Sequence, residues 1–188
     1  WLESICIPLE QVGKVKYKVP YVQDDNRIQE SGVKTMDCSE LVGRYAAKIE
    51  WCKTPMGWTT YKMIEYAEKN PKWLIKHNDP NYIPKRGDIF LWYGKRVDKK
   101  GVSHYSGHTG VVINYNSESD IVTTIEAIQS SVKNEKAINE RGEKYKENEN
   151  KKLAGTIKMH FFRKGFHLIG HNPVRCYFYT FAVHYSKK

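Results

Sequence analysis

The stretch KTMDCSELVGRYAAKIEW, residues 34–51, places the pattern of an amphipathic helix directly after a cysteine. Its apolar residues recur at steps of three and four, which is the helical period; they are Leu41, Val42, Tyr45, Ala46 and Ile49. Asp37 precedes the run and has the side chain of an N-cap. We therefore predict a helix from Cys38 to about Cys52 that stops at KTPMG (53–57), where a proline and a glycine occur.

The position of Cys38 admits two interpretations. At the first turn of a helix, the positive end of the helix dipole favours the thiolate, which is the nucleophilic form of the sulfur. Free cysteine is also among the most frequently buried residue types, so the alternative is a packing role. The choice depends on whether the rest of the chain supplies a base for this thiol.

The segments after this helix predict a second helix and then strands. The second helix is expected at TTYKMIEYAEKN (59–70), capped by Thr59 or Thr60. Runs rich in β-branched and aromatic residues then predict strands at 87–94, 108–115, 120–128, 155–162 and 175–185. Helices followed by a meander of strands predict an α+β fold, with N-terminal helices packed on one face of an antiparallel β-sheet.

Length and composition are those of one globular domain. The chain has 188 residues, of which 40% are hydrophobic and 28% charged, so a single domain over 1–188 has enough residues for a core. Residues 1–19 are expected to form an N-terminal extension, and the highly polar segment 133–152 a solvated surface excursion. No apolar run approaches the roughly 18 residues of a membrane helix, so no transmembrane segment is expected.

The balance of charges is strongly basic. Lys and Arg total 31 against 21 for Asp and Glu, which gives a formal net charge of +10. Such a charge favours attraction to polyanions, among them nucleic acid, an anionic membrane surface and an acidic cell-wall polymer. The aromatic residues follow strand-like alternation and not a ribonucleoprotein signature, so nucleic acid is not the expected partner.

The cysteines are scattered and form no CxxC pair. This spacing argues against a zinc site, and neither a metal nor another cofactor is predicted. The sequence leaves open one disulfide among Cys6, Cys52 and Cys176. The chain begins without a basic-then-apolar leader, which fits a removed signal peptide or a trimmed sequence equally well.

A cysteine nucleophile needs a base, and the base needs a third group that orients it. Among seven histidines, His108 is expected to open a strand after the polar, glycine-containing loop KKGVSHYSGHTGVVI (99–113), where side chains reach the edge of a cleft. Glu126 interrupts the apolar run of the next strand, and a buried carboxylate there requires a partner. Together the residues predict a Cys38–His108–Glu126 triad with the logic of a serine-protease site.

Other interpretations of these residues stay open. His108 taken alone fits a surface histidine, and Glu126 fits a pair with a lysine at the sheet edge. Metal ligation by His104 and His108 is disfavoured because the sequence offers no third ligand near them. Gly107 and Gly110 flank His108 and would let the backbone or a substrate come close.

The order of four motifs resembles that of the papain-like cell-wall amidases, the NlpC-type peptidases and the related CHAP amidases. The motifs are PYVQ (20–23), DCSELV (37–42), KRGDIFLW (85–92) and GHTGVVI (107–113). The resemblance covers about residues 20–128 and implies a papain-like fold with Cys38 as nucleophile and His108 as general base. It also implies that Tyr21 lies near the developing oxyanion, and that Asp37 and Ser39 border the site for the substrate's amino end.

Two positions depart from the NlpC pattern. Glu40 stands where the family motif has glycine, which adds a charge to the first turn of the helix. The third catalytic residue of NlpC enzymes is usually His, Asn or Gln, whereas Glu126 is closer to the CHAP pattern.

The resemblance implies a bacterial cysteine amidase or endopeptidase that hydrolyses an amide bond in peptidoglycan stem peptides through a thioester intermediate. Such an enzyme is expected in the periplasm, in the cell envelope or outside the cell, with its basic surface drawn to the anionic wall. The sequence leaves two alternative functions open. One is a papain-like acyltransferase or protein-directed cysteine protease, and the other is a non-catalytic cell-wall-binding module with a relic cleft.

Overall fold

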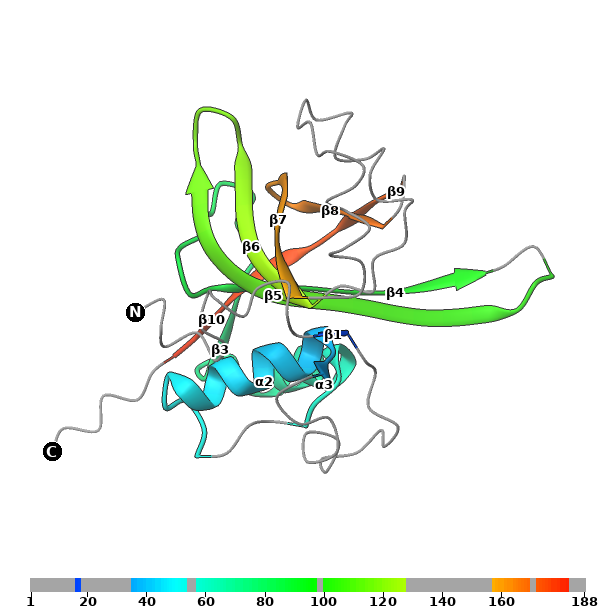
Figure 1. Ribbon diagram of the computed structural model, residues 1–188, viewed down its shortest axis with the longest axis horizontal. Coiled ribbons are helices and arrows are strands. Elements are labelled where there is room, and N and C mark those ends of the chain that lie inside the picture. Colours follow the sequence, from blue (N-terminus) through cyan, green and yellow to red (C-terminus); the bar gives the residue numbers. More distant parts are fainter. Residues whose placement is uncertain are drawn as a thin grey trace, which may run out of the picture.

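The computed structural model describes residues 16–17, 35–53, 57–97, 100–127, 157–169 and 172–182. Within these ranges, two helices lie against one face of a β-sheet (Figure 1). Tyr21, the polar segment 133–152 and all of the expected N-terminal extension except residues 16–17 fall outside the described residues.

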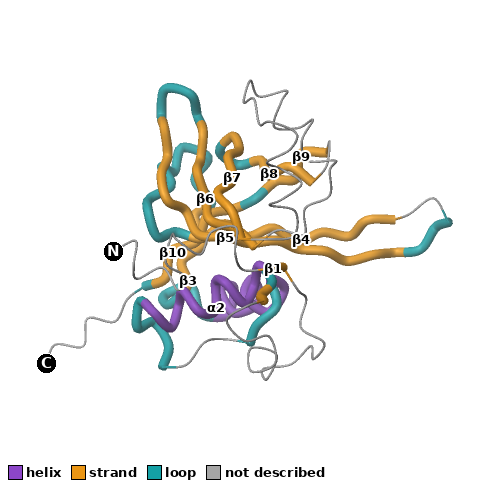
Figure 2. Tube along the Cα trace, viewed as in Figure 1, coloured by secondary structure: helices purple, strands orange, loops and turns teal. Residues whose placement is uncertain are grey.

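The elements follow one another along the chain as Figures 1 and 2 show. They are β1 (Lys16–Tyr17), β2 (Thr35–Met36), α2 (Cys38–Lys48), α3 (Thr60–Lys69), β3 (Leu74–His77), β4 (Ile89–Val97), β5 (Ser103–Asn116), β6 (Ile121–Ala127), β7 (Ile157–Arg163), β8 (Phe166–Ile169), β9 (Asn172–Arg175) and β10 (Tyr177–Phe181).

The main sheet has six strands in the order β3-β10-β4-β5-β6-β7, and each neighbouring pair is antiparallel. Strands β8 and β9 form a separate antiparallel pair, and β1 and β2 a short parallel one. The predicted α+β class, with helices on an antiparallel sheet, is confirmed. The prediction of a plain meander is wrong, because β10 inserts between β3 and β4 while only β4 to β7 follow in chain order.

Helix α2 starts as predicted but ends four residues before Cys52. Asp37 is the N-cap, and its side chain accepts the backbone N–H of Glu40. At the other end Glu50 adopts a left-handed backbone (φ 60°), and the N–H groups of Glu50 and Trp51 bond to the carbonyls of Ala47 and Ala46. This is a Schellman motif, which usually has glycine at the left-handed position, so the sequence carried no stop signal there.

Helix α3 agrees closely with its prediction. It spans Thr60–Lys69, with Thr59 as N-cap and Asn70 as C-cap. Strands β5 and β6 are joined by a hairpin turn, in which the Asn116 side chain accepts the N–H groups of Glu118 and Ser119.

Both faces of the main sheet are covered by apolar side chains. Along β4, Ile89 and Leu91 pack toward the helices, while Phe90 and Trp92 pack on the opposite face. On the helix side, α2 lies against β5 and β6, and α3 lies against β3, β4 and β5. The sheet therefore fixes the position of both helices, including the first turn of α2 where Cys38 lies.

Strand β5 is longer than predicted. It begins at Ser103 and pairs with β4 from Ile89↔Val111 to Val97↔Ser103. The two strands form an arm that projects beyond the rest of the sheet (Figure 1). The prediction of a loop before His108 is wrong, because the polar residues of this stretch lie in an exposed part of a strand. His108 accordingly lies inside β5, opposite Trp92, and not at a strand mouth.

The C-terminal strands differ from the prediction in number. Within the run 175–185, Arg175 ends β9, Tyr177–Phe181 forms β10, and residues 183–185 lie outside the described residues. Strands β3 and β8 were not predicted. Both missed strands have four residues, too short for alternation to identify them.

Cys38, Cys52 and Cys176 are not in disulfides, so no bridge links Cys52 to Cys176, and Cys6 lies outside the described residues. Among the described residues, no helix combines the length and the apolar character needed to cross a bilayer.

Candidate active site

Cys38 is the first residue of α2, and the chain before it is fixed by a local network. The Asp37 Oδ1 atom accepts the Glu40 N–H at 2.8 Å and the Ser39 hydroxyl at 2.9 Å. Both Asp37 and Ser39 are buried. These bonds hold the first turn of the helix in place and present the Cys38 side chain at its positive end.

Glu40, at the position where the family motif has glycine, is fully buried. Its Oε1 atom accepts two hydrogen bonds from Arg44 one turn later, from Nε at 2.9 Å and from the terminal nitrogen at 2.7 Å. A buried carboxylate with a guanidinium partner is neutralised locally. Glu40 therefore pairs with Arg44 within α2 and does not leave an exposed charge on the wall of a cleft.

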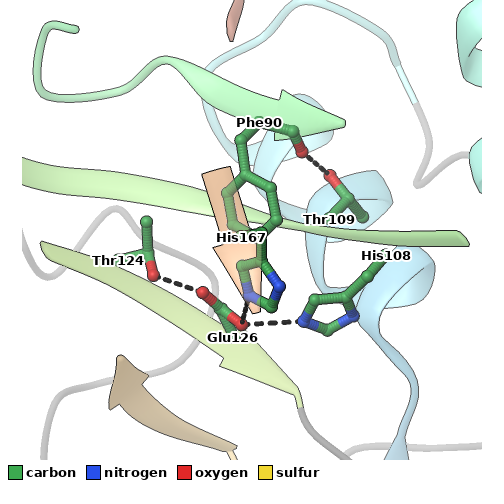
Figure 3. A network of polar contacts seen from close by, with 6 residues as sticks. All are labelled: Phe90, His108, Thr109, Thr124, Glu126 and His167. Carbon is green, nitrogen blue, oxygen red and sulfur yellow. Dashed lines mark hydrogen bonds and ion pairs between the residues drawn. The ribbon is translucent and has the colours of Figure 1, made fainter. Parts of the chain in front are cut away.

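Cys38, His108 and Glu126 come together although they lie on a helix and two strands. The His108 Nε2 atom lies 2.7 Å from Glu126 Oε2. Figure 3 shows the two side chains pointing toward each other. The Cys38 side chain forms a hydrogen bond with the His108 ring. Because Nε2 is bound to Glu126, Nδ1 is the ring nitrogen that faces the sulfur. The structure thus brings together, in the order Cys38–His108–Glu126, the three side chains that the sequence analysis grouped.

The surroundings of His108 keep its ring protonated. Burial lowers the pKa of the imidazole, but the neighbouring Cys38 and Glu126 outweigh burial and raise that pKa from 6.5 to about 10. A hydrogen-bonded carboxylate on one side and a sulfur on the other both favour the imidazolium form. His108 is therefore a proton donor at neutral pH, and the sulfur beside it is favoured as a thiolate.

Gly110 explains how Glu126 reaches His108. It follows His108 on the same face of β5, and a side-chain carbon added there would lie 2.6 Å from Glu126 Cγ and 2.9 Å from the Phe90 ring. Gly107 likewise lies against Thr60 of α3, whose hydroxyl would be 2.2 Å from an added carbon. The expected close approach of backbone at these two glycines is confirmed, and contact with a substrate stays a prediction.

The sequence reasoning missed a fourth member of the site, His167 on β8. Its Nε2 atom lies 3.1 Å from the same Glu126 Oε2 atom that binds His108, and the side chain is buried. Thr124 donates its hydroxyl to the other oxygen, Glu126 Oε1, at 2.5 Å. The carboxylate is therefore held on both oxygens.

His167 was missed because it lies in the C-terminal part of the chain, which the family resemblance does not cover. One signal was present. In RKGFHLIG (163–170) a histidine stands between apolar residues, and alternation places it on the face opposite Phe166, which is exposed.

His108, Glu126 and His167 also form a group that could hold a metal ion, since one ligand atom of each lies within 4.8 Å of the others. The separations of 2.7 and 3.1 Å between nitrogen and oxygen are those of hydrogen bonds. Hydrogen bonds also account for the Thr124 contact, and we interpret the group as a hydrogen-bonded network.

Neither of the other described thiols competes with Cys38 as a nucleophile. Burial raises the pKa of the Cys176 thiol to about 12 and raises that of Cys52 above its ordinary value. Both therefore carry their proton at neutral pH. The Cys38 residue is itself 7% exposed, and the His108 side chain 13%, so the pair is nearly enclosed but retains contact with solvent.

Comparisons of the chain with protein-family models, with curated proteins and with solved structures found no match. We therefore infer function from the geometry around Cys38, His108 and Glu126.

Proposed function

We propose that the protein is a cysteine amidase or endopeptidase with a papain-like arrangement of its helix and sheet. The observation that carries the proposal is the contact of His108 with Cys38 on one side and with Glu126, 2.7 Å away, on the other. If His108 had only a structural role, it would not need to contact a thiol at the start of a helix. A hydrolase that acts through a thioester needs all three groups.

In the first half of the reaction, the Cys38 thiolate attacks the carbonyl carbon of an amide, and the carbonyl electrons move to oxygen. The backbone N–H of Cys38 lies at the first helical position, where such groups have no acceptor within the helix, and it donates to this oxyanion. One donor of this kind contributes on the order of 3 kcal/mol. The family resemblance adds the Tyr21 hydroxyl as a second donor.

The tetrahedral intermediate then collapses, and the C–N bond breaks. The His108 imidazolium gives its proton to the leaving amine, which departs and leaves an acyl group on the Cys38 sulfur. Water, deprotonated by His108, attacks the thioester and releases the carboxylic acid, which restores the thiolate and the imidazolium. Glu126 stabilises the imidazolium in each half-reaction and fixes the orientation of the ring.

The proposed substrate is an amide bond in the stem peptides of peptidoglycan. This part of the proposal draws on the motif resemblance and on the net charge of +10, which suits a wall polymer that carries carboxylates and phosphates. It implies a bacterial enzyme that acts in the periplasm, in the cell envelope or outside the cell, with Asp37 and Ser39 bordering the site for the substrate's amino end.

The test is hydrolysis of purified peptidoglycan, followed by mass spectrometry of the released fragments. Cys38→Ala removes the nucleophile and should lower the rate roughly 10³-fold or more. Cys52→Ala is the matched control, since this half-buried free thiol lies outside the site, and it should leave the rate unchanged. Full activity of Cys38→Ala would overturn the mechanism.

Assays with other acyl and peptide substrates, and alkylation of Cys38, separate the alternatives. An acyltransferase or a protein-directed protease would cleave other acyl or peptide substrates in a Cys38-dependent way and leave peptidoglycan intact. A relic cleft in a binding module would leave Cys38 with the reactivity of an ordinary thiol, whose pKa is about 8.5.

A further inference from the structure

Glu126 is the most heavily bonded side chain of the candidate site. Its Oε2 atom contacts the Nε2 atoms of both His108 and His167, at 2.7 and 3.1 Å, and its Oε1 atom accepts the Thr124 hydroxyl at 2.5 Å. A triad needs only the first of these bonds. The other two require an explanation, because a buried polar side chain such as His167 is retained at a cost unless it has a partner.

The surroundings of His167 fix its ring in one place. The ring stacks on Phe90 with centroids 5.0 Å apart and an interplanar angle of 16°, and it meets Phe162 edge-on at 5.0 Å. The centroid of the Trp92 ring lies 6.3 Å from that of the His167 ring. These three buried aromatic side chains surround the His167 ring, whose Nε2 is directed toward Glu126. Figure 3 shows Phe90 beside this ring.

We propose that His167 is a positioning residue, which donates a hydrogen bond from Nε2 to Glu126 and so holds the carboxylate in its anionic form against His108. This inference rests on the proposed function, since it assigns His167 a role in maintaining the Cys38–His108 pair. Of the two neutral tautomers of His167, the one with the proton on Nε2 can donate to Glu126.

The physical reason lies in the burial of Glu126, which is 0% exposed. Burial favours the neutral carboxylic acid, whereas each donated hydrogen bond favours the carboxylate. Loss of the His167 donor leaves only His108 on Oε2, so Glu126 takes up a proton more readily. The imidazolium of His108 then loses its counter-charge, and the thiolate of Cys38 loses its partner in turn.

Among the described residues, four titratable groups contact Glu126 or its partners. They are Cys38 at the start of α2, His108 on β5, His167 on β8 and Cys176 between β9 and β10. The Cys176 thiol accepts a hydrogen bond from the backbone of His167, and burial keeps it protonated up to about pH 12. It does not titrate in the pH range where the Cys38–His108 pair forms, so it cannot shift the pH midpoint of Cys38 alkylation.

Two substitutions of His167 separate positioning from packing. His167→Phe keeps a ring for Phe90 and Phe162 to contact but removes the donor. His167→Gln loses the ring but places an amide N–H near the position of Nε2. The readout is the rate of Cys38 alkylation by iodoacetamide between pH 4 and 9, which needs no substrate and counts the thiolate directly.

If His167 acts by positioning Glu126, the pH midpoint of Cys38 alkylation in His167→Phe should rise by about one pH unit. The reason is that Glu126 then stabilises the His108 imidazolium less, and the imidazolium stabilises the Cys38 thiolate less. His167→Gln should keep the wild-type midpoint. Circular dichroism and thermal unfolding of both variants report whether they fold. Thr124→Val, which removes the donor to Oε1 and retains the branched shape, should also move the midpoint up.

The inference is overturned if His167→Phe titrates like the wild type. A shift of the midpoint in His167→Gln alone would then indicate packing alone. Failure of the proposed function has a different signature, namely a wild-type Cys38 that alkylates with an ordinary midpoint. Failure to cleave peptidoglycan would refute the substrate and leave the role of His167 intact.

Discussion

Glu40 and Glu126 are both fully buried carboxylates, yet their partners differ in kind. Glu40 binds Arg44 within the same helix, so this pair forms as soon as α2 does. Glu126 binds His108 on another strand, and that ring is also bonded to Cys38. A buried ion pair is weak evidence for stability, because desolvation offsets the attraction. The second pair is therefore better explained by the chemistry of the thiol than by folding.

The raised pKa of His108 predicts the alkaline limit of hydrolysis. Its imidazolium must protonate the leaving amine, and it persists up to about pH 10. Activity should therefore fall near pH 10, and not near the ordinary histidine value of 6.5. Glu126→Gln removes the negative charge beside the ring and should move this limit down by about one pH unit or more. The measurement is kcat/KM for a soluble stem peptide across pH 6 to 11.

Glu65→Gln provides the control for this titration. Glu65 lies on the exposed side of α3, where it pairs with Lys69, so its removal changes the net charge equally and leaves the site intact. An unchanged alkaline limit in Glu126→Gln would show that Glu126 does not support the imidazolium. Equal shifts in both variants would point to a general charge effect.

At the scale of elements, the sequence identified those whose signals are local. Helix α2 has a capping residue and a helical period, and β6 has an apolar run bounded by Asp120, so both were predicted close to their observed positions. Strand β5 was predicted too short because its first residues are polar. Their pairing depends on β4 and not on their own hydrophobicity. The early end of α2 depends on a left-handed Glu50, which no pattern indicates.

The site was predictable to the same extent as its elements. Two of the site residues are unusual at their positions in the sequence. Cys38 is a thiol directly after an N-cap, and Glu126 is a charged residue within an apolar strand. His108 was selected for a position at a strand mouth that it does not occupy, although the residue itself faces both partners. His167 was missed because a four-residue strand brings it to Glu126 from 41 residues away. Such a contact follows only from tertiary structure.

The contact between β5 and β6 depends on the absence of a side chain at Gly110. Gly110→Ala would place a carbon 2.6 Å from Glu126 Cγ and 2.7 Å from the Ile125 carbonyl oxygen. The strands or Glu126 must then shift, at a cost of about 1–3 kcal/mol. We expect a lower melting temperature and a loss of hydrolysis larger than the loss of stability explains, because the displaced carboxylate no longer faces His108.

Gly94→Ala is the matched variant on the neighbouring strand, where an added carbon meets no atom within 4 Å. It should change neither the melting temperature nor the rate of hydrolysis appreciably. A Gly110→Ala protein that behaves in the same way would show that the spacing between Gly110 and Glu126 is not required for the site.

At the scale of the whole molecule, the site is divided between two layers. The helix layer supplies Cys38, and the sheet with its flanking strand β8 supplies His108, Glu126 and His167. The layers are joined by apolar side chains such as Leu41 and Tyr45 from α2 against Leu91 and Val111 from the sheet. Formation of the thiol–imidazole pair therefore depends on the docking of α2, and alkylation of Cys38 at low pH reports native packing.

The net charge of +10 acts over the whole surface and predicts salt-dependent binding to purified cell walls. Because the Debye length falls from about 30 Å at 0.01 M to about 3 Å at 1 M salt, the fraction that sediments with wall material should fall steeply over this range. The triple variant Lys48→Gln, Lys53→Gln, Lys72→Gln removes three exposed positive charges and should dissociate at lower salt. Replacing the exposed carboxylates Glu50, Glu68 and Glu118 with Gln should have the opposite effect. If all three proteins sediment equally at every salt concentration, charge does not bring this protein to the wall, and recognition must come from contacts within the site itself.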